Sequence, residues 1–181
     1  MKIIIGLGNP GKKYENTRHN VGFAAVEALV EKIGSSWENN KKFQAQICQG
    51  GNTILVKPQT FINNSGQSVQ AILSYYKLLP KKLGMFKIKD SDLSEILTVI
   101  HDDIDISLGK HKISVDSRSA GHRGVQSIIN HLKTKNFTRI RIGIRTEMAN
   151  RMPADQFVLQ KFRGEELKII DGLINKIISE I

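Results

Sequence analysis

The sequence is poor in cysteine and has no long apolar run. Cys48 is its single cysteine, which excludes an internal disulfide, and without any CxxC pair a structural zinc site would lack its usual ligands. No apolar run approaches the roughly 18 residues needed to cross a bilayer, and no charged-then-apolar leader follows Met1. We therefore expect a cytoplasmic protein with no membrane partner.

Aromatic residues and acidic residues are also scarce. Aromatics make up 6% of the chain, and Trp37 is the one tryptophan, which argues against a base-stacking platform of the kind that single-strand-binding proteins use. Lysine and arginine number 27 against 17 acidic residues, a formal net charge of +10. Such a field attracts phosphate polymers, so nucleic acid is the favoured class of partner.

The order of apolar segments predicts one α/β domain. A chain of 181 residues can bury a single core. Short apolar or alternating runs predict strands at 2–6, 42–49, 53–57, 96–100, 110–115 and 139–144. Apolar stripes at helical spacing predict helices at 21–33, after 63–65, at 121–132 and from 165 onward. Strands alternating with helices indicate a single three-layer domain over 1–181, in which helices flank a mixed β-sheet. The lysine-rich stretch 80–94 has little periodicity and predicts a basic loop insertion.

Gly6, Gly8 and Gly11 form a G-x-G-x-x-G pattern directly after the first expected strand. This spacing occurs in dinucleotide-binding turns, where backbone amides approach a pyrophosphate. Pro10 removes one of those amides, however, and Lys57 stands where a ribose-binding carboxylate would be expected. The alternative is a tight strand-to-loop turn in which glycines relieve crowding.

His101, Asp102, Asp103 and Asp105 form the densest acidic cluster, at the end of an expected apolar strand. Three carboxylates can hold Mg²⁺ for a nuclease. The simpler interpretation is a strand-to-turn corner with solvated acids. Because side chains alternate along an extended segment, Asp102 is expected to point away from His101 and Asp103.

His19 lies in a polar loop after the first strand, where an α/β sheet opens its ligand crevice. A neutral imidazole there can accept a proton from water. Asp102, at the end of a neighbouring strand, can hold the far ring nitrogen, and Asn9 and Asn63 can orient a carbonyl and the attacking water. No serine or cysteine occupies a nucleophile-elbow pattern, which disfavours an acyl-enzyme. The residues alone leave this assembly as one possibility among several.

Six sequence blocks together resemble the bacterial peptidyl-tRNA hydrolase family, in the order in which the family has them. The blocks are 5–23 (IGLGNPGKKYENTRHNVGF), 57–66 (KPQTFINNSG), 101–109 (HDDIDISLG), 121–128 (GHRGVQSI), 137–144 (FTRIRIGI) and 157–162 (FVLQKF). The resemblance spans nearly the whole chain. It implies a monomeric α/β protein without metal or cofactor that hydrolyses the ester joining a peptide to tRNA.

The resemblance also implies roles for individual residues. His19 matches the general base, and Asp102 matches the residue that stabilises and orients it. Asn9 resembles the residue that distinguishes N-blocked from free aminoacyl ends. Three further positions match residues that contact the tRNA end or the peptide: Tyr14, Phe61 and Asn63.

The sequence departs from the family pattern at several positions. Arg123 stands where the family's GHNG segment usually has asparagine, which places a larger, charged donor that can bind a phosphate or the tRNA 3′ end. Ile62 replaces a common methionine with little expected consequence. At the two positions that resemble a clamp for the tRNA 5′ phosphate, Lys112 is retained and Ser114 is uncharged, and Lys110 is near enough to compensate. The alternative function is a tRNA-binding relative that has lost turnover because of Arg123.

Overall fold

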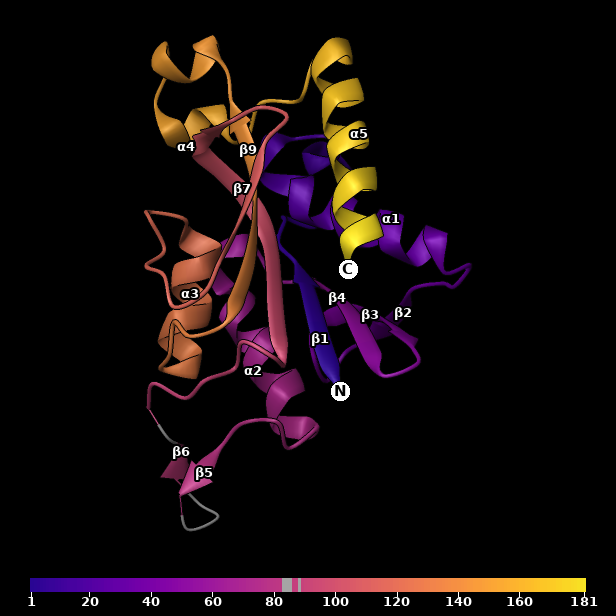
Figure 1. Ribbon diagram of the computed structural model, residues 1–181, viewed down its shortest axis with the longest axis vertical. Coiled ribbons are helices and arrows are strands. Elements are labelled where there is room, and N and C mark those ends of the chain that lie inside the picture. The colour runs from indigo at the N-terminus through magenta and orange to yellow at the C-terminus, as the bar shows by residue number, and fades with distance from the viewer. Residues whose placement is uncertain (83–85, 88) are drawn as a thin grey trace.

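In a computed structural model that describes residues 1–82, 86, 87 and 89–181, most of the strands form one mixed sheet (Figure 1). Its order is β2-β3-β4-β1-β7-β9-β8, in which β1 pairs in parallel with β4 and β7, and β7 pairs in parallel with β9. The strands of this sheet are β1 (Lys2–Gly6), β2 (Glu38–Asn40), β3 (Ala45–Gly50), β4 (Thr53–Pro58), β7 (Leu97–Ser107), β8 (His111–Ser114) and β9 (Thr138–Arg145).

Helices cover both faces of the sheet. The longer ones are α1 (Val21–Lys32), α2 (Ser65–Tyr75), α3 (Arg123–Leu132) and α5 (Gly164–Glu180), and α4 (Ala154–Phe157) is a single turn. Ile3 and Ile5 pack in the apolar cluster that includes the α2 and α3 side chains, whereas Ile4 packs with α1 and α5. Consecutive isoleucines of β1 are therefore buried on opposite faces of a central strand. The three-layer fold predicted from the sequence is confirmed.

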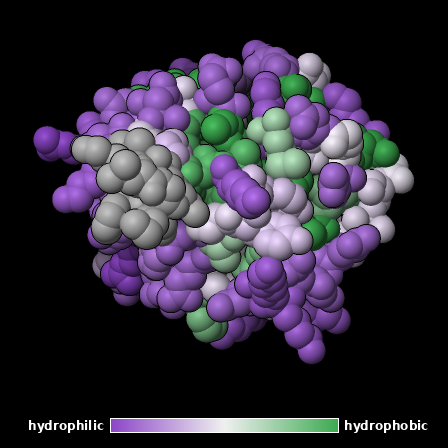
Figure 2. All heavy atoms as spheres, turned by 90° about the horizontal axis from the view of Figure 1, so that it is seen from below, coloured by the Kyte–Doolittle hydropathy of each residue, from purple (hydrophilic) through white to green (hydrophobic). Residues whose placement is uncertain are grey.

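The surface at one end of the molecule is mostly hydrophilic, as expected for a chain with a formal net charge of +10. Figure 2 views the molecule from below, the end at which β1 and β7 begin, and hydrophilic side chains surround a smaller hydrophobic area there. Among the described residues, none of the helices combines the length and apolar character needed to span a bilayer.

Two parts of the chain differ from the sequence-based expectation. The strand expected at 96–100 continues to Ser107 as β7, so the acidic cluster lies within a strand and the solvated corner predicted for it is wrong. Backbone pairing with β9 extends the strand past Asp102, which pairs with Ile142. In the basic stretch 80–94, β5 (Lys81–Lys82) pairs antiparallel with β6 (Phe86–Lys87), while 83–85 and 88 lie outside the described residues.

The glycines after β1 serve packing between strand and helix. A Cβ at Gly6 would collide with the Gly22 carbonyl of α1, and one at Gly8 would lie 2.7 Å from the Phe23 ring. A Cβ at Gly22 would lie 2.6 Å from the Leu7 amide nitrogen. These contacts favour the interpretation that the glycines relieve crowding, because they let the end of β1 and the residues after it approach α1 closely.

Gly22→Ala is expected to lower the free energy of unfolding by about 2 kcal/mol, because the added methyl group meets backbone that cannot move aside. Gly172→Ala in α5 is the matched control, since a Cβ there would have no neighbour within 4 Å, and it should raise stability by up to about 1 kcal/mol through helix propensity. Urea denaturation measures both. Equal effects of the two substitutions would contradict the close contact.

Candidate active site

A cavity of about 570 Å³ opens where several chain segments leave the sheet. Since β1, β4 and β7 run in parallel, their carboxyl ends meet at one edge, which is where α/β sheets bind ligands. The loop after β1 contributes Asn9 and His19, the turn after β4 contributes Phe61, and β7 contributes Asp102. The start of α3 and the segment around α4 complete the wall.

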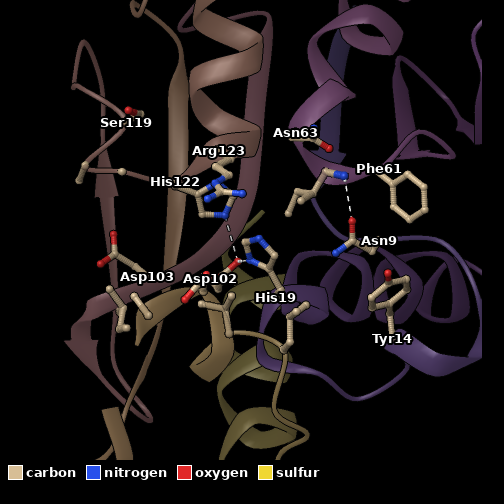
Figure 3. Close-up of a pocket in the computed structure, with 18 residues that line it drawn as sticks. Asn9, Tyr14, His19, Phe61, Asn63, Asp102, Asp103, Ser119, His122 and Arg123 are labelled. Atoms are coloured by element: carbon tan, nitrogen blue, oxygen red, sulfur yellow. Dashed lines mark hydrogen bonds and ion pairs between the residues drawn. The ribbon is translucent and has the colours of Figure 1, made fainter. Parts of the chain in front are cut away.

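His19 and Asp102 meet at the base of this cavity (Figure 3). The His19 Nδ1 lies 2.8 Å from the Asp102 Oδ1, and their side chains are 11% and 3% exposed. Because a carboxylate only accepts, the ring donates through Nδ1–H. Its Nε2 has no hydrogen-bond partner among the described residues. That leaves a nitrogen lone pair available to a water molecule or substrate in the cavity.

His122 is a third member of this group, and the sequence-based prediction missed it. Its Nε2 lies 3.0 Å from the same Asp102 Oδ1. At the N-cap of α3 its Nδ1 accepts a hydrogen bond from the Val125 amide at 3.2 Å, so the neutral ring carries its proton on Nε2 and donates it to Asp102. The sequence predicts a helix over 121–132, which places His122 inside it, whereas the helix begins at Arg123 and His122 is its N-cap.

The electrostatics of the pair favour a basic His19. Burial alone lowers the His19 pKa, but the Asp102 charge and hydrogen bond outweigh it, so the pKa is raised above its usual value, with Arg123 opposing. Burial alone would raise the Asp102 pKa, yet His19 and His122 lower it far below the usual range. Asp102 therefore remains a carboxylate throughout the physiological pH range.

The other acids of the cluster do not join this group. The Asp103 Oδ2 accepts from the Arg141 Nε at 2.7 Å, and Asp105 is exposed. The different partners of Asp102 and Asp103 agree with the expected alternation along the strand, although both residues line the cavity. Burial holds the His101 pKa well below its usual value. The three carboxylates thus have separate surroundings, unlike the ligands of a magnesium site.

Asn9 is held rigidly beside His19. Its side chain is buried, and its Oδ1 accepts from the Ile62 amide at 2.9 Å. Asn20 holds the Asn9 backbone through both its amide and its carbonyl group. The Asn9 Nδ2, turned toward the His19 side in Figure 3, has no partner among the described residues. A fixed amide donor therefore lies next to the imidazole.

An aromatic wall forms one side of the cavity. The Tyr14 and Phe61 rings meet edge to face with centroids 6.3 Å apart, and Phe61 is 54% exposed. Asn63 lines the same cavity and is exposed. The structure therefore brings these three predicted residues together with Asn9 and His19.

The three predicted basic residues divide between the cavity and its surroundings. Arg123 is the first residue of α3, lines the cavity, is exposed, and has no ion-pair partner among the described residues. Lys112 lies on the edge strand β8, and Lys110 precedes that strand. Both lysines are exposed and outside the cavity lining. The structure does not bring them to His19.

Comparisons with known proteins give a consistent result. The family model described as peptidyl-tRNA hydrolase matches residues 3–181. The peptidyl-tRNA hydrolase of Mycoplasma mycoides subsp. mycoides SC is 41% identical over 185 residues, covering 98% of this chain and 89% of the relative. The Fusobacterium nucleatum subsp. nucleatum enzyme is 43% identical, with 98% and 85% covered. The crystal structure of peptidyl-tRNA hydrolase from Acinetobacter baumannii superimposes with a TM-score of 0.83 and 33% identity, covering 99% of this chain and 85% of that one.

Asp102→Asn is expected to lower the His19 pKa, because it removes the negative charge that stabilises the imidazolium. An NMR titration of the His19 ring measures the change. Asp105→Asn, an exposed acid on the same strand, is the control and should leave the His19 titration unchanged. An unchanged His19 pKa in Asp102→Asn would show that the contact with Asp102 does not raise the pKa of His19.

Proposed function

This chain belongs to the peptidyl-tRNA hydrolase family, and from that premise we propose that it cleaves the ester between peptide and tRNA with a water molecule activated by His19 and Asp102, without a metal ion. The observation that carries the proposal is the 2.8 Å contact between the His19 Nδ1 and the Asp102 Oδ1, which leaves the other ring nitrogen available at an open cavity. The proposed product is a free tRNA that returns to translation.

The reaction follows from the positions of these groups. Water gives a proton to the His19 Nε2 and attacks the acyl carbon, and the Asp102 carboxylate stabilises the imidazolium that forms. When the tetrahedral intermediate collapses, the bond between the acyl carbon and the ribose oxygen breaks, and the imidazolium returns its proton to that oxygen. General base catalysis of this kind contributes roughly 10²- to 10⁴-fold in rate.

Asn9 and Asn63 are the proposed amide donors. The Asn9 amide is fixed by its contact with the Ile62 backbone, so it can donate to substrate without reorganising. Asn63 lies on the turn after β4 and lines the same cavity. A donor that meets the developing oxyanion is worth about 3 kcal/mol in the transition state.

The remaining residues are proposed to bind the two halves of the substrate. The exposed faces of Tyr14 and Phe61 suit the tRNA end or the peptide, and Arg123 brings an exposed guanidinium to the same cavity. Lys110 and Lys112 lie outside it and suit phosphates farther along the acceptor stem. The family resemblance supports a monomer that acts in the cytoplasm, with peptidyl-tRNA as its partner.

The donor set supports a metal-free mechanism. Among the described residues, the metal-ligand atoms that converge within 4.8 Å of one another are those of His19, Asp102 and His122. The His19 Nδ1 and the His122 Nε2 are both within hydrogen-bond distance of the same Asp102 oxygen. The group is thus internally satisfied as a hydrogen-bond network, and a metal ion would have to displace both ring protons.

Arg123 favours a second candidate function, a tRNA-binding relative without turnover. Its charge opposes protonation of His19, and it occupies the position of the family's smaller amide. The retained His19, Asp102, Asn9 and Asn63 favour the enzyme.

The purified protein is expected to release the peptide from an N-acetyl-aminoacyl-tRNA in the presence of EDTA. His19→Ala should reduce the cleavage rate by about 10²-fold or more while leaving tRNA affinity nearly unchanged, because it removes a base and no phosphate contact. Single-turnover cleavage and tRNA binding are measured on the same preparations. Tight tRNA binding without ester cleavage by the wild type would favour the second candidate, and a strict Mg²⁺ requirement would refute the mechanism.

Lys112→Ala is expected to weaken tRNA binding and to reduce the slope of log affinity against log salt by about 0.9, the loss of roughly one duplex phosphate contact. Lys176→Ala, an exposed lysine on α5, is the control and should leave the slope unchanged. Binding titrations at several salt concentrations provide the slopes. An identical slope in both variants would remove Lys112 from the tRNA interface.

A further inference from the structure

Arg18, the residue before His19, is buried in the protein. Its side chain is 1% exposed, and its guanidinium carbon lies 4.5 Å from the Phe157 ring centroid and 4.9 Å from that of Phe162. Both rings belong to the segment between β9 and α5, which is far away in sequence. A planar guanidinium stacks on aromatic faces in a way that a lysine ammonium does not.

Glu166 supplies the counter-charge for Arg18. The Arg18 Nη2 donates to both carboxylate oxygens of Glu166, at 2.8 and 2.9 Å. The Nε and Nη1 atoms are buried and have no partner among the described residues. Arg18 is buried while Glu166 is 14% exposed, and a largely buried ion pair with two unsatisfied donor nitrogens is not the most stable arrangement, because well-packed apolar side chains often stabilise a core equally well. The arrangement therefore points to a role in placing the chain.

The backbone around Arg18 follows the same segment. The amides of Arg18 and His19 donate to the carbonyl groups of Gln160 and Val158, at 3.0 and 2.8 Å. Thr17 forms an antiparallel bridge with Lys161. The main chain that carries His19 is thus paired with the chain just after α4.

This segment also forms part of the cavity wall. Val158 and Leu159 line the cavity that contains His19. At the start of α5, a Glu166 carboxylate oxygen accepts from the Arg163 amide at 2.7 Å, which satisfies the N-cap amide of this helix. Glu166 therefore links the beginning of α5, the cavity wall and the loop that bears the imidazole. In Figure 1, α4 and the first turns of α5 lie at the same end of the molecule.

We propose that Arg18 and Glu166 are positioning residues: their ion pair, stacked between Phe157 and Phe162, fixes the backbone of His19 against the wall of the cavity. This inference rests on the proposed function, in which His19 is the base. Neither residue touches substrate in this proposal. Their effect is exerted through the location of the imidazole.

The test compares Glu166→Ala and Glu166→Gln with Glu27→Gln in the full-length protein. Glutamine keeps an acceptor for Arg18 and for the α5 cap, whereas alanine removes both. Glu27→Gln is the matched control, because it removes the negative charge from another ion pair, in which the Lys57 Nζ lies 2.6 Å from the Glu27 Oε1. Lys57 belongs to β4 and not to the segment that carries His19. The readouts are kcat and KM for N-acetyl-aminoacyl-tRNA cleavage and hydrogen exchange at the His19 amide, measured by NMR.

Glu166→Ala is expected to lower kcat by about tenfold or more, since a misplacement of about 1 Å costs up to about 10²-fold. KM should change by less than about twofold, because the substrate contacts remain. A lower kcat with an unchanged KM indicates that stabilisation of the transition state is lost. Exchange at the His19 amide should accelerate, Glu166→Gln should be intermediate in both readouts, and Glu27→Gln should match the wild type. If Glu166→Ala does not fold, the comparison of kcat and His19 amide exchange between Glu166→Gln and Glu27→Gln tests the proposal.

Unchanged kcat with accelerated exchange would overturn the proposal, and so would a lower kcat with unchanged His19 protection. The failure of the proposed function is a separate result. If His19→Ala retained full activity, His19 would not be the general base and the proposed function would fail. The exchange measurement in the Glu166 variants would still report whether Glu166 holds the His19 backbone.

Discussion

The site depends on the buried carboxylate of Asp102. A carboxylate that is 3% exposed is costly unless donors satisfy it, and the donors come from two segments that are distant in sequence. His19 arrives on the loop after β1, and His122 arrives at the N-cap of α3. Because both rings converge on one oxygen, the loop, strand β7 and helix α3 are fixed relative to one another. The same hydrogen bonds that make the buried charge tolerable also define the floor of the cavity.

The proposed chemistry uses the balance of charges around His19. Burial and the Arg123 charge lower its pKa, and Asp102 raises it more strongly. A base needs a neutral ring before the reaction and a stable imidazolium afterwards, and the carboxylate serves the second requirement. His122 donates to the same Asp102 oxygen and helps to keep that group a carboxylate. Arg123 opposes the imidazolium while offering a positive charge to substrate, so one residue acts on both binding and protonation.

Local patterns offered the pairing of His19 with Asp102 as one possibility among several, and the family resemblance singled it out. His19 follows β1 and Asp102 lies within β7, and these parallel strands point their carboxyl ends toward one edge of the sheet. The contact of His122 was missed because it depends on the orientation of a ring at a helix N-cap, which spacing does not encode. The length of β7 was missed because charged residues usually end a strand. Here Arg141 pairs with Asp103, a long-range contact that allows the strand to continue.

The position of the imidazole needs more than its contact with Asp102. A single hydrogen bond fixes the distance between two atoms, but the ring can still pivot around it, so the orientation of the free nitrogen depends on the backbone. That backbone has few local restraints, since η2 (Arg18–Asn20) is a short 3₁₀ turn without a side-chain cap. The restraint comes instead from the hydrogen bond between the His19 amide and the Val158 carbonyl. An α/β domain can therefore carry its base on a polar loop, provided that a distant segment of the chain holds the loop in place.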